Sequence, residues 1–342
     1  MNRRAWLCYG ILALTALGCG PTELGQSAVH VQELKRARLA SAADIGGVFL
    51  EFPAAMARWK DSLVIVDMLG SQIVVLPRSL EGGRAFGREG AGPGELRSPQ
   101  GVAVHDESLA VFDRANARVT WYDASGELRG ARGVMIASLK PKFVALEGMG
   151  LLLPAASADH YTLVDLPEGA AEAGGMAAGP LLPRPAGAAP SGEMPITSNM
   201  VVRSSGEVYV VDAENGLVIR GDPEALAVDS LPPRIHASVT RVVDSLTAGA
   251  PERVVTPIIA AGEAPGGVLV WFAGPGENWG AILDSAGSWT EVRVEPHLRA
   301  EFPPNPADVF IWDDELFVLT QDGVRVFGLG EPGDMERIEA VK

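Results

Sequence analysis

One pattern recurs along most of this chain and restricts the folds that it can adopt. A proline stands ten to thirteen residues before a short run rich in leucine, valine or aromatic residues, and a turn and a second apolar run follow. The first two copies show the pattern best, with LVIVD and QIVVL after the first proline and LAVFD and RVTWYD after the second. Six prolines open such units, spaced 42 to 62 residues apart: Pro53, Pro99, Pro141, Pro195, Pro257 and Pro306.

Each unit is built of short strand-like segments. The apolar runs are rich in β-branched and aromatic residues and are bounded by Gly, Asp, Asn and Ser, which is typical of strands joined by turns. A unit of about 40–50 residues with three or four strands has the size of one propeller blade. The sequence therefore predicts an all-β protein, a six-bladed β-propeller over residues 37–342. An irregular β-sandwich is the alternative, but it does not explain the regular place of the proline.

Two further features complete the predicted propeller. Val239, Val242, Val243 and Leu246 follow helical spacing, so we expect one short helical insertion between blades four and five, with Ser238 as N-cap and Gly249 as stop. Propellers commonly close by pairing a terminal strand into the last blade, which removes a free edge. We expect residues 37–47 to pair beside VRVFGL near the C-terminus, with the C-terminal ERIEAV as the competitor for that place.

The first 18 residues have the layout of a signal peptide. Arg3 and Arg4 precede a short apolar core, and the segment ends in TALGC at Cys19. Small residues before a cysteine resemble the lipobox of bacterial lipoproteins, which implies lipidation of Cys19 and a tether over residues 19–36. We expect a protein held in the cell envelope by this lipid alone, on the periplasmic or outer-membrane surface. Ordinary secretory cleavage nearby is the alternative.

Composition narrows the classes of partner. The formal net charge is −15, and the only basic cluster after the signal peptide is KRAR at Lys35 to Arg38. Nucleic-acid binding is excluded on this ground, because phosphate recognition needs a basic surface. The expected partner is a protein, peptide or glycan of the cell envelope, and the expected state is a monomer.

The glycine-rich stretch GREGAGPGELRSPQG, Gly87 to Gly101, is a structural connection. It lacks the Gly-Lys-Ser/Thr of a P-loop, because Glu95 follows Gly94. We expect it to join the outermost strand of one blade to the innermost strand of the next. Together with VFDRANARVTWYDASGE, it resembles NHL-type six-bladed propellers and, more closely, bacterial exported six-bladed propeller lipoproteins. That resemblance implies a fold and a location rather than an activity.

Polar residues at turns are the first candidate site. Asp67, Asp113 and Asp212 each end the second strand of a unit. They form either a ring of carboxylates able to bind a cation or caps for their own turns, and turn capping is favoured because Asp does this routinely. With Asn116 they are candidate contacts of the loop face. Trp279 is the candidate for an exposed aromatic contact there.

The axial mouth is the second candidate site. Four polar residues near the starts of the innermost strands would line it: Gln100, Lys142, Asn199 and Asp308. A binding or scaffold module is the favoured function, because the chain shows no nucleophile elbow, no repeated histidine and no cofactor fingerprint. The alternative is a metal-dependent hydrolase or lactonase, with Asp308 and Asn199 as ligands of a divalent cation such as calcium. No catalytic residue is assigned.

Overall fold

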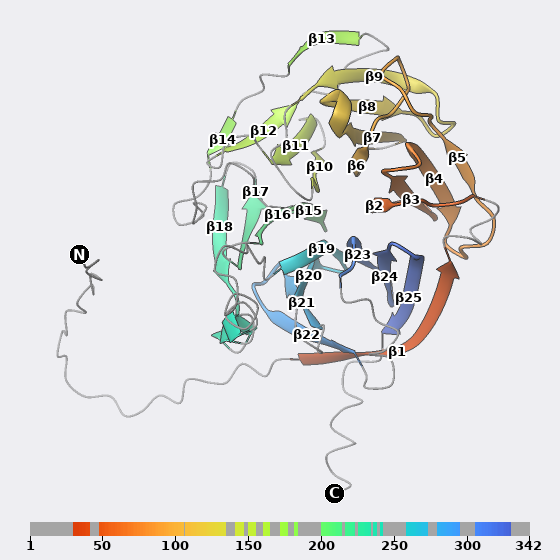
Figure 1. The fold of residues 1–342 in the computed structure, drawn as a ribbon. Helices are drawn as coiled ribbons and strands as arrows, with labels where there is room; N and C mark the ends of the chain where they lie inside the picture. The colour runs from red at the N-terminus through yellow and green to blue at the C-terminus, as the bar shows by residue number, and fades with distance from the viewer. Residues whose placement is uncertain are drawn as a thin grey trace, which may run out of the picture.

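Short strands arranged in blades around a central axis make up the computed structural model (Figure 1). The all-β propeller that the repeat predicts is therefore confirmed. No helix in the described part of the chain is long and apolar enough to cross a membrane. The described residues are 30–41, 48–105, 107–134, 141–146, 150–154, 160–164, 172–176, 181–183, 200–213, 216–222, 225–233, 235–237, 240–241, 258–272, 279–294 and 305–329.

Four of the sheets follow the chain blade by blade, and consecutive strands within each are antiparallel. The first contains β2 (Pro53–Trp59), β3 (Ser62–Asp67), β4 (Gln72–Pro77) and β5 (Arg84–Phe86). The second contains β6 (Pro99–His105), β7 (Ser108–Asp113), β8 (Arg118–Tyr122) and β9 (Leu128–Gly133), with β13 (Glu172–Met176) added parallel to β9. The third contains β10 (Val144–Leu146), β11 (Gly150–Pro154), β12 (His160–Val164) and β14 (Leu181–Pro183). The fourth contains β15 (Met200–Ser204), β16 (Glu207–Asp212), β17 (Leu217–Asp222) and β18 (Ala225–Ser230).

The fifth sheet has eight strands, in the order β19-β20-β21-β22-β1-β25-β24-β23. Its members are β1 (His30–Ser41), β19 (Ile258–Ala264), β20 (Gly267–Phe272), β21 (Trp279–Asp284), β22 (Trp289–Val294), β23 (Asp308–Trp312), β24 (Glu315–Thr320) and β25 (Gly323–Leu329). Counted as hydrogen-bonded sheets, the described residues form five blades, and the prediction of six separate ones is wrong. The physical reason is β1, which pairs parallel with β22 on one side and antiparallel with β25 on the other.

The N-terminal strand closes the propeller. β1 pairs with β25 from Leu34 opposite Leu329 to Ser41 opposite Gly323, as expected for an N-terminal closing strand. The strand begins at His30, so residues 30–36 belong to the sheet and not to the expected tether. The competing C-terminal segment ERIEAV and the predicted lipidation site Cys19 lie outside the described residues.

The innermost strands form a closed ring around the axis. In the described part of the chain β2 contacts β6, β6 contacts β10, β10 contacts β15, β15 contacts β19, β19 contacts β23, and β23 returns to β2. Glycine allows the closest of these approaches. A Cβ atom on Gly262 of β19 would lie 1.6 Å from the carbonyl oxygen of Val309 in β23. A Cβ atom on Gly101 of β6 would lie 2.3 Å from that of Pro141.

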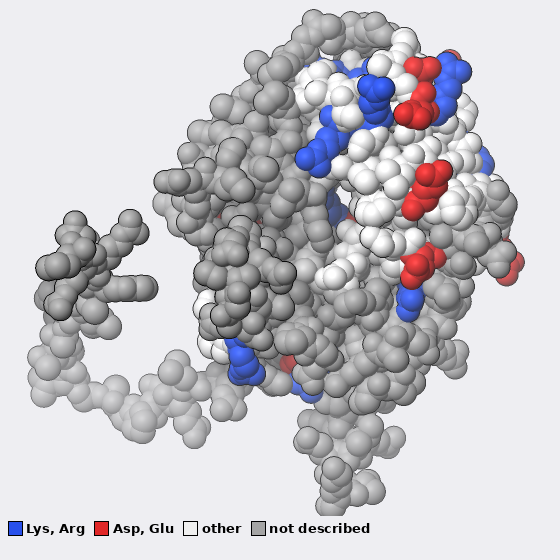
Figure 2. Space-filling model, viewed as in Figure 1, with Lys and Arg blue, Asp and Glu red and all other residues white. Residues whose placement is uncertain are grey.

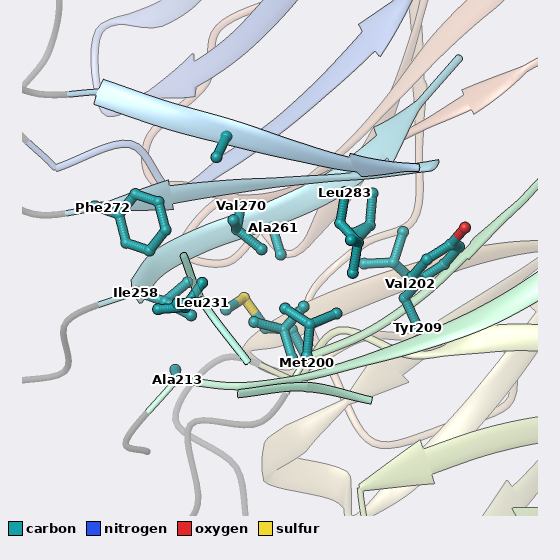
Figure 3. Packing of buried hydrophobic residues seen from close by; sticks show 14 of the residues in the cluster. Met200, Val202, Tyr209, Ala213, Leu231, Ile258, Ala261, Val270, Phe272 and Leu283 are labelled. Carbon is teal, nitrogen blue, oxygen red and sulfur yellow. The ribbon is translucent and has the colours of Figure 1, made fainter. Parts of the chain in front are cut away.

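Apolar side chains fill the space between neighbouring blades. Because successive residues of a strand point to opposite faces, β20 buries Val268, Val270 and Phe272 against one neighbour and Leu269 and Trp271 against the other. Figure 3 shows the first of these layers, where Met200, Val202 and Tyr209 of the fourth sheet meet Ala261, Val270 and Phe272. The second strand of each unit is therefore buried on both faces, which explains why its sequence is continuously apolar instead of alternating between apolar and polar residues.

A short helical segment lies between β18 and β19, as predicted. Its described helical residues are 233, 235–237 and 240–241, and the backbone N–H of His236 donates to the carbonyl of Pro232 at 2.9 Å. The helix thus begins before the predicted N-cap. Ser238 and Gly249 themselves lie outside the described residues.

One arginine makes several of the hydrogen bonds that hold the glycine-rich connection between β5 and β6. Arg118 of β8 donates through Nη2 to the carbonyls of Gly92 (2.9 Å) and Glu95 (2.7 Å). Its Nε donates to the carboxylate of Asp113 at 3.2 Å. Gly94 takes a positive φ of 72°, which glycine adopts readily. The stretch is thus the structural connection that the sequence predicts.

Candidate ligand site on the propeller axis

Three of the four residues predicted at the axial mouth come together. Gln100, Lys142 and Asp308 line one small cavity of about 30 Å³. Asn199 lies outside the described residues. Gln100 is already engaged, because it accepts from Nη1 of Arg114 at 3.0 Å.

Asp308 is fully occupied by donors. Its carboxylate forms an ion pair with Nζ of Lys142 and accepts from the backbone N–H groups of Met56 (3.0 Å) and Val309 (2.9 Å). The carboxylate is buried and the lysine is largely buried. This pair therefore ties β23 to the residue two positions before β10, across the axis.

A larger cavity of about 300 Å³ adjoins this ion pair along the axis. All of the innermost strands named above contribute to its wall, and Val102 and Lys142 line both cavities. Figure 2 shows a hollow near the centre of the ring, where atoms of basic side chains are visible. The side chains that carry its chemistry are Arg58, Lys142, Arg203, Ser204 and Glu263.

Two charged groups of this cavity, Arg58 and Glu263, have no hydrogen-bond or ion-pair partner within the described residues. Arg203 donates to the carbonyl of Ala145 at 3.4 Å. Arg58 places its guanidinium carbon 4.8 Å from the centre of the Trp312 ring, but it donates no hydrogen bond and forms no ion pair within the described residues. Burial raises the pKa of the Glu263 carboxyl, while the nearby positive charges of Arg58 and Lys142 oppose that rise. Glu263 likewise has no hydrogen-bond or ion-pair partner among the residues described.

The strand-end aspartates lie in three separate sheets, and two of them bind the segment that enters the innermost strand of their own sheet. Asp67 is fully buried and accepts from the backbone N–H groups of Glu51 (2.9 Å) and Phe52 (2.7 Å). Asp113 is equally buried and accepts from the N–H of Arg97 at 2.7 Å and from Asn116 at 2.6 Å. The backbone donors lie 15 or 16 residues before each aspartate, so both carboxylates fix the entry to the innermost strand. From the turns that follow these aspartates, the N–H of Gly70 donates to Asp67 at 3.4 Å and the side chain of Asn116 donates to Asp113.

The other three residues predicted to contact a partner on the loop face are Asp212, Asn116 and Trp279. Asp212 is buried and has an interaction partner. Asn116 also donates to the carbonyl of Gly90 at 2.9 Å, so its side-chain amide serves the glycine-rich connection. Trp279 begins β21, and its side chain lies outside the description. Among the described residues, no three His, Cys, Asp or Glu side chains lie close enough together to hold a metal ion.

Sequence reasoning missed Arg58, Arg203 and Glu263. Each is the next-to-last residue of an innermost strand, directly before the residues that open the hairpin turn: Trp59 pairs with Ser62, Ser204 with Glu207 and Ala264 with Gly267. A charged residue at this one position of an otherwise apolar strand is the signal that could have identified them.

Comparison with known proteins shows the fold and no family. No protein-family model matches this chain, and no curated protein matches it. Solved structures do. An exported protein from Bacteroides fragilis aligns with a TM-score of 0.56 at 11% identity, covering 88% of this chain and 99% of that one. A streptogramin B lyase aligns with a TM-score of 0.50 at 11% identity, covering 86% and 98%.

A third solved structure gives the same result. Virginiamycin B lyase from Staphylococcus aureus aligns with a TM-score of 0.50 at 10% identity, covering 86% of this chain and 99% of that one. At such identities the likeness shows the β-propeller fold alone, and function must be argued from the site.

Proposed function

We propose that this protein is an exported binding module of the cell envelope whose ligand enters the axial cavity. The partner is a protein, peptide or glycan that inserts one group into this space, and the lipid on Cys19 holds the module at the membrane surface. The observation that carries the proposal is the cavity of about 300 Å³, with Arg58 and Glu263 in its wall, neither of which has a hydrogen-bond or ion-pair partner among the described residues. Binding sites are typically concave spaces with a few converging polar groups.

We also infer that the eight-stranded sheet serves as two blades joined by β1. The strands β19 to β22 and β23 to β25 each begin at the axis and run outward in order (Figure 1). The innermost strands of both halves, β19 and β23, belong to the ring of contacts around the ligand cavity.

The alternative, a metal-dependent hydrolase or lactonase at the axial mouth, has weaker support. Its proposed ligand Asp308 already accepts from Lys142 and from two backbone N–H groups. A cation would have to displace Lys142, and a largely buried lysine that loses its partner is costly. We therefore favour binding over hydrolysis.

A cavity-filling substitution tests the proposal. Val104 lines the cavity and is half-buried, so Val104→Trp should obstruct it. Val228 on β18 is 42% exposed and lies outside that wall, so Val228→Trp is the matched control. Purified protein is immobilised and exposed to an envelope extract, and captured components are identified. Loss of capture in Val104→Trp alone supports the proposal. Equal capture by both variants, with melting temperatures like that of the parent, refutes it.

A further inference from the structure

We infer that the group bound in the axial cavity is the head group of an amino acid, which carries one ammonium and one carboxylate. The inference rests on the proposed function, because it names the chemistry that the same cavity recognises. It is carried by one cation and one anion of the wall, Arg58 and Glu263. The head group belongs either to a free amino acid or to a peptide that displays it at the end of a side chain.

The other charged groups of the wall already have partners. Lys142 forms an ion pair with Asp308. Arg203 donates to a backbone carbonyl at 3.4 Å and has a further interaction partner. This leaves Arg58 and Glu263, whose formal charges cancel. A ligand that brings one charge of each sign therefore keeps the cavity neutral, whereas a ligand with a single charge leaves one of these two groups uncompensated.

Arg58 and Glu263 lie on two innermost strands that flank a third. β23 contacts both β2 and β19, and each of the two residues stands next to last in its strand. The positive charge of Arg58 acts on the carboxyl of Glu263, yet no hydrogen bond or ion pair joins these two described side chains. Phe310 is the residue of β23 that lines the cavity. The two charges therefore stand at one end of the cavity, on either side of a strand that adds an apolar side chain to the wall.

Trp312 orients Arg58 without using its donors. The indole is buried, with 2% of its surface exposed. The guanidinium carbon of Arg58 lies 4.8 Å from the ring centre, and that of Arg78 lies 4.7 Å from it. Arg78 is itself fixed by ion pairs with Asp313 and Glu315. Contact with the buried ring restricts the guanidinium of Arg58 before any ligand arrives, which lowers the entropic cost of binding.

A carboxylate is the anion that suits Arg58. The planar set of donors on a guanidinium matches the two oxygens of a carboxylate or of a phosphate. A phosphate monoester carries a charge of about −1.5 to −2, which exceeds the single positive charge of Arg58. A carboxylate carries one negative charge, so the cavity stays neutral when an ammonium accompanies it.

A primary ammonium is the cation that suits Glu263. The carboxylate of Glu263 can accept hydrogen bonds from the three N–H donors of an ammonium, whereas a quaternary ammonium offers no such donors. Burial raises the pKa of this carboxyl, and the positive charges of Arg58 and Lys142 oppose that rise. A positive charge on the ligand therefore adds to the interactions that keep Glu263 ionised.

Most of the remaining wall is apolar, which indicates the kind of side chain that accompanies the head group. Ala57, Val104 and Val144 line the cavity and are half-buried, so a ligand can contact them. A space of about 300 Å³ lies at the lower end of the range for small-molecule sites, about 300–1,000 Å³. This wall and this volume suit one amino-acid unit with an apolar side chain or arm.

Leucine and two of its derivatives test the inference. Leucine carries both charges, N-acetylleucine only the carboxylate and leucinamide only the ammonium. Each is titrated into the full-length protein by calorimetry at pH 6.5, where the amino groups are protonated. A fourth probe, Nε-acetyllysine, presents the same head group on a longer neutral arm, as a peptide would display it. We expect leucine or Nε-acetyllysine to bind, and the two single-charge probes to bind about tenfold more weakly or not at all.

Two substitutions separate the two charges of the site. Arg58→Gln should weaken binding of the best probe by about tenfold or more and shift the preference toward leucinamide, because the carboxylate loses its partner. Glu263→Gln should weaken binding to a similar extent and shift the preference toward N-acetylleucine. General damage to the fold would not produce opposite shifts. Arg84→Gln is the matched control, because Arg84 also lies over an aromatic ring, that of Phe86, and does not line the cavity.

Preference for leucine or Nε-acetyllysine over both single-charge probes, with opposite shifts in the two variants and none in the control, supports the inference. Binding of leucine without Nε-acetyllysine indicates a free amino acid, and binding of Nε-acetyllysine indicates a displayed head group. Equal binding of all probes, preference for a single-charge probe, a preference that neither variant changes, or no binding of any probe overturns the inference.

The outcomes also separate this inference from the proposed function. If no probe binds as expected and Val104→Trp still abolishes capture of an envelope component, the cavity remains the binding site and only its chemistry was wrong. If Val104→Trp captures normally while leucine binds through Arg58 and Glu263, the proposed partner is wrong and the head-group site stands.

Discussion

Removing Arg118 should be among the most damaging single changes to this fold. Its side chain is only 15% exposed, and it pairs with Asp113, whose side chain is fully buried. It also donates to the carbonyls of Ala91, Gly92 and Glu95, which belong to the connection between the first two blades. Arg118→Met keeps the apolar stem of the side chain and deletes all of these bonds.

The size of the stability loss depends on the buried carboxylate of Asp113, which remains without its arginine. Removing one partner of a buried ion pair typically costs about 3–5 kcal/mol, because the remaining charge is uncompensated. Asp113 retains donors from Arg97 and Asn116, so we expect the lower end, about 3 kcal/mol. In urea denaturation the midpoint should fall while the slope stays unchanged. Arg129→Met is the control, because that ion pair with Asp123 involves an arginine side chain that is 56% exposed and should matter little.

The pH dependence of this loss identifies its cause. Burial already raises the pKa of Asp113 above 3.8, and Arg118 opposes that rise, so the substitution should raise the pKa further. A carboxyl with a raised pKa in the folded state destabilises the protein as pH increases through that pKa. The deficit of Arg118→Met should therefore be full at pH 8 and shrink toward pH 4, and Asp113→Asn should relieve it. A loss below about 1 kcal/mol, the level of a surface pair, would refute the reasoning, as would an equal loss at both pH values.

Three further predictions address the axis and the anchor. Gly262→Ala should destabilise the protein by about 1–3 kcal/mol or more, because the added Cβ would overlap the carbonyl of Val309. Thermal unfolding measures this loss. An unchanged melting temperature would contradict the close approach of the two strands. Glu263→Gln should stabilise the protein increasingly as pH rises above 4.5, because the raised pKa of Glu263 makes its ionisation unfavourable in the folded state. A difference in the free energy of unfolding between parent and variant that does not change with pH would contradict this prediction. Cys19→Ala should abolish incorporation of radioactive palmitate, and retained label would show that the anchor is elsewhere.

The fold was predictable from local patterns that recur. The stretch from Gly87 to Gly133 contains the glycine-rich connection, the strands and the turn after Asp113 in the order that the sequence predicts. The joining of two blades by β1 was not predictable, because it depends on pairing between residues 30–34 and 290–294. No local propensity encodes a register across that distance in the chain.

The site was predictable only in part, for a related reason. Gln100, Lys142 and Asp308 were found because they stand near the starts of aligned innermost strands, and that alignment is visible in the repeat. Arg58, Arg203 and Glu263 stand at the other end of such strands, where the other three innermost strands place apolar residues: Val104, Ala145 and Ile311. Alignment of the repeats shows what the units share, so a charged residue that only some units carry does not stand out. A site on the axis, however, requires such residues.

The two ends of the axis differ, and the difference bears on how a ligand enters. The Lys142–Asp308 pair joins opposite sides of the ring near the starts of the innermost strands, and only a cavity of about 30 Å³ lies beside it. The larger cavity extends from Lys142 to Ser205 and Gly206, which form the turn after β15. A ligand that enters at these turns meets Arg58, Arg203 and Glu263 before it reaches the ion pair. In the binding function proposed above, the pair is the floor of the site, and the charged ends of the innermost strands are the surface that the ligand meets first.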